Sequence, residues 1–282
     1  MSGFGPVVSA AWLAEHLDDP DLVVVDVRWY LDGRSGREAY ANGHIDGAVF
    51  ADLDTDLSAP PSKEGGRHPL PEPTDFAAAM QRLGVSDSSR VVAYDDAGGV
   101  IAARLWWMLD VLDQPAAVLD GGISTWTGEL VKSSSEGGAE VGARSDFSVR
   151  PWPSERIMTK AQMVDVIGTA MVVLDARSPE RFAHGGPVDP RPGHIPGARN
   201  APATDNFDDG RFRSATDSRA AYEALGVGSA PTVAYCGSGV TACSDLIGIR
   251  LAGLTDAKLY VGSWSAWGAD EALPAETGPA EP

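Results

Sequence analysis

The chain has 282 residues, 43% of them hydrophobic and 22% charged, and its formal net charge at pH 7 is −18. This acidity argues against nucleic acid or an anionic membrane as partner, because both require a basic protein surface. The apolar runs fall short of the ~18 residues of a membrane span, and the length is comfortable for two domains.

The two cysteines, Cys236 and Cys243, limit the redox and metal chemistry that the chain can carry. They form neither a disulfide framework nor a C-x-x-C pair, and they offer too few ligands for zinc. The first residues lack the basic start and apolar core of a signal peptide. We therefore expect a reducing, cytoplasmic location and no metal or cofactor.

In chain order, the first half alternates short β-branched runs with amphipathic segments. Strands are predicted over residues 23–26, 90–94 and 116–119, and helices over 10–17, 74–83 and 100–112. Ser9 and Thr74 are predicted N-caps, and Gly84 is predicted to end the second helix.

The second half repeats this alternation. Helices are predicted over residues 159–167 and after Val240, and strands over 171–175, 232–235 and 258–261. Alternating strands and helices predict an α/β fold with parallel sheets, helices on both faces, and functional loops at the carboxyl ends of strands. The expected organisation is a domain over 1–131, a linker over 132–153, a domain over 154–268, and a frayed acidic tail over 269–282.

Four motifs occur twice in the same order, about 141 to 150 residues apart. V-V-V-D-V-R at 23–28 returns as V-V-L-D-A-R at 172–177, and G-H-I-D-G-A at 43–48 returns as G-H-I-P-G-A at 193–198. V-V-A-Y at 91–94 returns as T-V-A-Y at 232–235, and G-G-I-S-T-W at 121–126 returns as G-S-W-S-A-W at 262–267. The pattern indicates a tandem domain duplication.

Cys236 stands where a predicted strand ends and a loop of small residues leads into a helix. The backbone N–H groups of such a loop, at Gly237, Gly239, Val240 and Thr241, together with the helix dipole, form a nest for an anion. A thiolate profits from such a nest, which lowers the pKa of a cysteine below its usual ~8.5. The pattern favours a nucleophilic cysteine that is reachable from solvent, the alternative being a buried structural cysteine beside a tight turn.

Together these motifs resemble the tandem-domain rhodanese family, the thiosulfate and 3-mercaptopyruvate sulfurtransferases, over roughly residues 8–268. The resemblance implies two rhodanese-like α/β domains, of which only the second carries the reactive cysteine. Asp95 stands in the first repeat where Cys236 stands in the second. A carboxylate cannot accept a sulfane sulfur, so the first domain is expected to be catalytically silent.

The resemblance also implies a reaction. The Cys236 thiolate takes a sulfur atom from a small-molecule donor and becomes a persulfide, and a thiol, cyanide or a thioredoxin-like protein then removes that sulfur. The loop C-G-S-G-V-T resembles the 3-mercaptopyruvate type, because thiosulfate-preferring members carry cations at the positions of Gly237 and Ser238. Thiosulfate remains the alternative donor.

Two arginines match the family pattern for holding the donor carboxylate: Arg181 in R-F-A-H-G and Arg191 in D-P-R. Ser238 is a candidate for a hydrogen bond to the substrate carbonyl or for relaying a proton, and is otherwise a small turn residue. His44 resembles a histidine that members of the 3-mercaptopyruvate type place near this serine. Its repeat partner His194, and Ser35 at the position of the expected acid, favour a structural role instead.

Other charged residues receive weaker predictions. Arg67 and His68, in a loop that the second half lacks, are candidates for the active site. The repeated strand-end pairs are predicted to form buried structural ion pairs: Asp26 with Arg28, and Asp175 with Arg177.

Two rival functions are considered. A cysteine phosphatase needs C-x5-R, and Ala242 occupies the arginine position. A non-catalytic rhodanese-like binding module fits the first domain better than the second, since the second keeps its cysteine loop.

Overall fold

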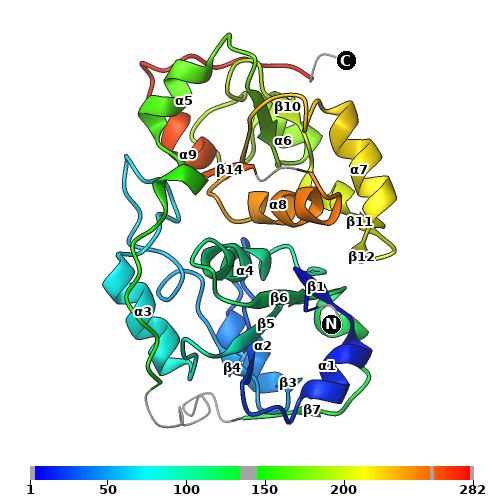
Figure 1. Cartoon of the computed structure of the whole chain (residues 1–282). Coiled ribbons are helices and arrows are strands. Elements are labelled where there is room, and N and C mark those ends of the chain that lie inside the picture. Colours follow the sequence, from blue (N-terminus) through cyan, green and yellow to red (C-terminus); the bar gives the residue numbers. More distant parts are fainter. Residues whose placement is uncertain (1–3, 134–144, 255–256, 280–282) are drawn as a thin grey trace. The chain divides into compact units, whose positions relative to one another are not determined.

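A computed structural model describes residues 4–133, 145–254 and 257–279. The chain forms two compact units. Unit 1 comprises Met1–Ala59 and Pro71–Trp152, and unit 2 comprises Pro60–Leu70 and Pro153–Pro282. The segment Pro60–Leu70 therefore lies within the first repeat of the sequence but is part of unit 2, which the sequence did not predict. Figure 1 traces the chain through both units.

Unit 1 contains a five-stranded sheet in the order β1-β6-β5-β2-β4, with every neighbouring pair parallel. Its strands are β1 Val7–Val8, β6 Ala116–Leu119, β5 Arg90–Tyr94, β2 Leu22–Asp26 and β4 Val49–Phe50. Its helices are α1 Ala10–His16, α2 Gly36–Asn42, α3 Pro73–Arg82 and α4 Ala103–Asp110, with a short 3-10 turn η1 at Gly122–Thr125. A small antiparallel pair joins β3 His44–Ile45 to β7 Leu130–Val131.

Unit 2 repeats this topology. Its five-stranded parallel sheet has the order β8-β14-β13-β9-β10, with β8 Ile157–Met158, β14 Lys258–Tyr260, β13 Thr232–Tyr235, β9 Val172–Asp175 and β10 Arg199–Asn200. Its helices are α5 Lys160–Val166, α6 Pro179–His184, α7 Ala215–Ala224, α8 Ala242–Leu251 and α9 Ser263–Trp267. Two 3-10 turns, η2 Ser154–Arg156 and η3 Ala203–Asn206, and the ribbon β11 Phe207–Asp208 with β12 Arg211–Phe212 complete it. The duplication and the α/β class are confirmed.

The predicted elements agree closely with the observed ones, with two informative differences. Ser9 caps α1 by accepting the N–H of Trp12 at 3.1 Å, and Gly84 follows α3 with φ +77°. Helix α3 begins at Pro73 with Glu72 as N-cap, so the predicted cap at Thr74 is wrong, because a proline fits the first helical position. Helix α4 begins three residues later than predicted, because the preceding residues bind Asp95.

The repeated Asp–Arg pairs lie at the ends of the central strands, as predicted. Arg28 binds Asp26 and donates to the carbonyl of Gly43, and Arg177 binds Asp175 and donates to the carbonyl of Gly193, both at 2.8 Å. Each pair therefore ties a strand end to the G-H-I turn of its own unit. Since these charges are buried, removing one partner would leave the other uncompensated.

Residues on either side of the second repeat are more ordered than expected. Residues 145–152 belong to unit 1, where Phe147 is edge-on to Phe76 at 6.0 Å. Within the predicted linker, residues 134–144 lie outside the described residues. Glu276 exchanges two backbone hydrogen bonds with His194, at 2.8 and 3.0 Å. The expectation of a frayed tail is therefore wrong for residues 269–279, because this segment covers the second G-H-I turn.

Among residues 4–133, 145–254 and 257–279, no helix combines the length and the apolar character that crossing a bilayer requires.

Candidate active site

Cys236 directly follows β13, and its loop leads into α8. The N–H of Gly239 points to the sulfur, with N···Sγ 3.1 Å. Burial raises the pKa of Cys236, but hydrogen bonds from the Thr241 hydroxyl and from the N–H groups of Ser238, Ala242 and Gly239 outweigh it, so the pKa is lowered. Val240 takes part in the turn that leads into α8, where its carbonyl accepts the N–H of Cys243. The loop therefore stabilises a thiolate, through the Thr241 hydroxyl and through main-chain N–H groups.

The first residues of helix α9, which contain the G-S-W motif, hydrogen-bond to the backbone of the cysteine loop. Trp264 and Ser265 donate their N–H groups to the carbonyls of Cys236 and Gly237, both at 2.9 Å. The Ser263 hydroxyl accepts the N–H of Cys236 at 3.1 Å and donates to the carbonyl of Tyr260 at 2.9 Å. These bonds fix the backbone on which the sulfur sits.

Gly239 is required for this close approach. Its φ is +77°, and a Cβ at this position would lie 2.5 Å from the carbonyl oxygen of Val261. A larger residue would therefore push the cysteine loop away from Val261 and withdraw the Gly239 N–H that faces the sulfur.

His68 and Ser238 form a hydrogen-bonded pair beside the cysteine, with Nδ1···Oγ 2.8 Å. His68 reaches this place because Pro60–Leu70 is part of unit 2. That segment is closed by reciprocal backbone bonds between Ser62 and Gly66, at 2.9 and 2.8 Å. The segment is attached to helix α9 by the N–H of Arg67, which donates to the Ser265 hydroxyl at 3.0 Å.

The histidine beside Ser238 is thus His68, and His44 has the structural surroundings that its repeat partner favoured. The His44 ring stacks on Tyr40 at 3.9 Å, with Nδ1 2.9 Å from the Tyr40 carbonyl oxygen. His194 makes the same arrangement with Phe182, at 3.6 and 3.1 Å. Both histidines therefore hold their G-H-I turns. Ser35 caps α2 by accepting the N–H of Glu38 at 3.1 Å.

The two predicted carboxylate-binding arginines have different surroundings. Arg181 binds Asp189 through Nε at 2.9 Å and Nη2 at 2.6 Å. Its Nη2 would also lie 2.8 Å from a Cβ on Gly237, which places it at the cysteine loop. Arg191 donates to the carbonyl of Leu273 at 2.7 Å, in the segment that follows α9. The structure thus brings Arg181 to the loop and engages Arg191 with the C-terminal segment.

Access to the sulfur differs from expectation. Cys236 is only 1% exposed, and Ser238 and His68 are 5% and 2% exposed. The expectation of a sulfur that is reachable from solvent is therefore wrong for this structure, in which the guanidinium groups of Arg181 and Arg67 lie against the cysteine loop at Gly237.

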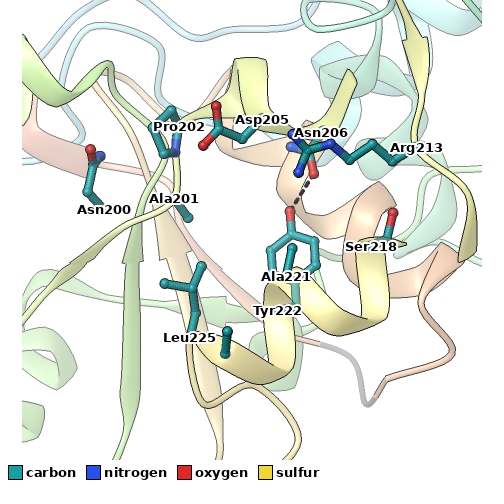
Figure 2. A pocket seen from close by; sticks show the side chains of 11 residues that line it. Asn200, Ala201, Pro202, Asp205, Asn206, Arg213, Ser218, Ala221, Tyr222 and Leu225 are labelled. Atoms are coloured by element: carbon teal, nitrogen blue, oxygen red, sulfur yellow. Dashed lines mark hydrogen bonds between the residues drawn. The ribbon is translucent and has the colours of Figure 1, made fainter. Parts of the chain in front are cut away.

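The structure also contains a buried polar network that the sequence analysis did not predict, which joins Tyr222 and Asn206 to Asp245 of α8. A cavity of about 240 Å³ is lined by residues that include Tyr222 and Asn206, and a 2.6 Å hydrogen bond joins these two. Figure 2 shows the lining side chains and this bond. Asn206 also donates to Asp245 of α8 at 2.7 Å. Burial, and the negative charge of Cys236, raise the pKa of Asp245 well above its usual value. The raised pKa of Asp245 therefore disfavours a second buried negative charge near the thiolate. The signal in the sequence is a lone acid in the apolar helix after Cys236.

Comparisons with known proteins agree with this geometry. Residues 9–129 and 159–270 each match the family model of the rhodanese-like domain. The chain is 42% identical to a Pseudomonas aeruginosa protein named "Probable 3-mercaptopyruvate sulfurtransferase", covering 96% of this chain and 98% of that protein. It is 34% identical to "Thiosulfate/3-mercaptopyruvate sulfurtransferase 1, mitochondrial" of Arabidopsis thaliana, covering 96% and 78%. The crystal structure of the 3-mercaptopyruvate sulfurtransferase of Escherichia coli matches with a TM-score of 0.80 and 32% identity, over 92% of this chain and 99% of that one.

The chain therefore belongs to the rhodanese-like family. It is a two-domain sulfurtransferase enzyme of that family.

Proposed function

We propose that this enzyme takes sulfur from 3-mercaptopyruvate onto Cys236 and passes it from the resulting persulfide to a thiol, cyanide or a thioredoxin-like protein. The observation that carries the proposal is the His68–Ser238 pair, 2.8 Å apart, next to a thiol whose pKa the loop lowers. The names of the P. aeruginosa and E. coli relatives support the same donor. A reducing compartment such as the cytoplasm would keep the thiol available.

The first half-reaction needs both a nucleophile and a proton path. The Cys236 thiolate attacks the donor sulfur, the carbon–sulfur bond breaks, and its electron pair passes to the carbon as the enolate of pyruvate. The proton of the donor thiol moves to that enolate, and pyruvate leaves. We infer that Ser238 and His68 relay this proton; their hydrogen bond supports the inference, since the hydroxyl can donate on one side while the imidazole accepts from it.

The second half-reaction needs the persulfide to be stable until an acceptor arrives. The N–H groups of Ser238, Gly239 and Ala242 that lower the pKa of the thiol would equally favour the negative charge on a persulfide. The acceptor nucleophile attacks the outer sulfur, and Cys236 returns as the thiolate, which gives ping-pong kinetics.

The donor carboxylate requires a cation, and Arg181 is the better placed of the two predicted arginines. Two of its N–H groups hold Asp189, and a guanidinium has three more to offer. Arg191 remains part of the proposal as a second anchor, which requires it to release the carbonyl of Leu273. Because Cys236 is buried, we propose that donor binding displaces side chains that lie over the loop.

The test is to supply the purified enzyme with 3-mercaptopyruvate and to measure pyruvate and the intact mass. Wild-type enzyme should release pyruvate and gain about 32 Da, one sulfur atom, on Cys236. Cys236→Ser should lose both responses, and Cys243→Ser should keep them. Pyruvate release by Cys236→Ser at the wild-type rate would overturn the proposal.

A further inference from the structure

The cysteine loop carries no cation in its sequence, but the structure brings cations to it from elsewhere. A Cβ on Gly237 would lie 2.8 Å from Nη2 of Arg181 and 3.5 Å from Nη2 of Arg67. Two guanidinium groups therefore occupy the space in which a side chain at position 237 would begin. Arg67 Nη2 also lies 3.4 Å from Oγ of Ser238, two residues after the nucleophile.

Arg67 is held in this place at three points. Its backbone N–H donates to Ser265 Oγ at 3.0 Å, and its Nη1 donates to the carbonyl of Val188 at 3.3 Å, in addition to the contact with Ser238. Gly66 makes the placement possible: its φ is +81°, and a Cβ there would lie 2.5 Å from both the Gly262 carbonyl oxygen and Ser265 Oγ. The segment therefore presents Arg67 in a fixed position, as a functional cation requires.

We propose that Arg67 is the donor-selecting residue of the site and binds the sulfonate oxygens of thiosulfate, giving the enzyme a second donor. The inference rests on the persulfide chemistry proposed above. The Cys236 thiolate attacks the outer sulfur of thiosulfate, the sulfur–sulfur bond breaks, and its electron pair leaves with sulfite. The charge balances, since a thiolate and a dianion become a persulfide anion and the sulfite dianion.

The position of Arg67 suits thiosulfate better than 3-mercaptopyruvate. The sulfonate oxygens are bonded to the atom next to the attacked sulfur, and so lie close to Cys236 and Ser238. The carboxylate of 3-mercaptopyruvate is separated from its sulfur by two further carbons and so lies farther from the loop. The dianion also gains about twice as much Coulomb energy from a given cation as the monoanion. Sulfite leaves without a proton, so this route does not depend on the relay through Ser238.

The experiment measures kcat/KM with both donors for Arg67→Gln and Arg67→Lys, with Arg219→Gln as control. Arg219 lies on the surface of α7 and pairs with Glu223, so its variant removes the same charge far from the chemistry. Loss of a charged hydrogen bond predicts a fall of roughly tenfold or more for thiosulfate in Arg67→Gln, mainly through KM, and a change of less than about threefold for 3-mercaptopyruvate. Arg67→Lys should fall in between, and Arg219→Gln should match wild type with both donors.

Equal losses with both donors, or no loss with thiosulfate, would overturn the assignment of Arg67. Equal rates of Cys236 alkylation in the Arg67 variants and wild type would show that the loop itself is intact. A wild-type enzyme that takes sulfur from neither donor would instead refute the proposed function, so the two failures are distinguishable.

Discussion

The two strand-to-helix loops of the duplicated sheet hold different acids in the same kind of nest. In unit 1, the Asp95 carboxylate accepts four N–H groups, from Ala97, Gly99, Ile101 and Ala102, at 2.7 to 2.9 Å. In unit 2, the sulfur of Cys236 takes the place of that carboxylate. The two loops share one further hydrogen bond. In unit 1 the Ile123 N–H of η1 donates to the carbonyl of Asp95 at 2.8 Å, and in unit 2 the Trp264 N–H of α9 donates to the carbonyl of Cys236 at 2.9 Å.

The comparison shows that the fold supplies the backbone N–H groups of both loops, whereas the side chain at the end of the strand determines the direction in which its pKa shifts. Burial raises the pKa of Asp95 despite its four donors, whereas in Cys236 the donors outweigh burial and lower the pKa. A carboxylate in the nest stabilises the loop, but it has no nucleophilic sulfur. The Cys236 loop also has Ser238 where the Asp95 loop has Ala97, and that serine is bonded to His68.

The largest effect is expected from removing the Ser238–His68 pair, for which the Asp95 loop has only Ala97 at the position of the serine. Ser238→Ala, like His68→Gln, should lower kcat with 3-mercaptopyruvate by roughly 10²–10⁴-fold, because the enolate then lacks its proton relay. Turnover with thiosulfate should fall much less, since sulfite leaves unprotonated. Steady-state kinetics with both donors tests this, and an equal loss with each donor would show that the pair only shapes the loop.

A smaller effect is expected on stability when each nest loses its anion. Asp95→Ala leaves four buried N–H groups without their acceptor and should destabilise the region around β5 and α4 by about 2–4 kcal/mol. Cys236→Ala should cost its own region less, because sulfur is the weaker acceptor. Hydrogen exchange resolved along the chain measures both, since two units need not unfold together. A larger loss in Cys236→Ala would contradict the prediction.

The smallest effect is a pH dependence of opposite sign in the two loops. For Cys236 the folded pKa lies below the unfolded one, so its contribution to stability is present above the unfolded pKa and is lost as pH falls through the folded pKa. For Asp95 the folded pKa is raised, so its contribution is present below the unfolded pKa and is lost as pH rises through the folded pKa.

Alkylation of Cys236 against pH, in the Cys243→Ser background, reports the first of these directly. The midpoint should lie below the ~8.5 of a free cysteine. A midpoint at or above that value would show that the loop does not stabilise the thiolate.

Much of the fold could be predicted from the sequence, because the strands and turns are encoded by neighbouring residues and the same motifs occur in both halves of the chain. Buried β-branched runs predicted the central strands of both sheets, and the repeated V-x-D-x-R and G-H-I motifs predicted the same connections in each half. The hydrogen bonding of the cysteine loop to the sulfur could be predicted as well, since the N–H groups involved are within a few residues of Cys236. The errors at Thr74 and at the start of α4 were local, since the residues that decide these boundaries are only a few positions away. The error on the C-terminal segment arose because its partner, His194, is distant in sequence.

By itself, the sequence determined the duplication and the parallel sheets, and it predicted the nucleophile, because each depends on residues that are close along the chain. Only the tertiary structure decided which histidine meets Ser238 and which cations meet Gly237. These choices depend on Pro60–Leu70 joining unit 2, although about 170 residues separate this segment from the cysteine loop. No local pattern encodes such a contact, because its stability comes from the surface on which the segment packs.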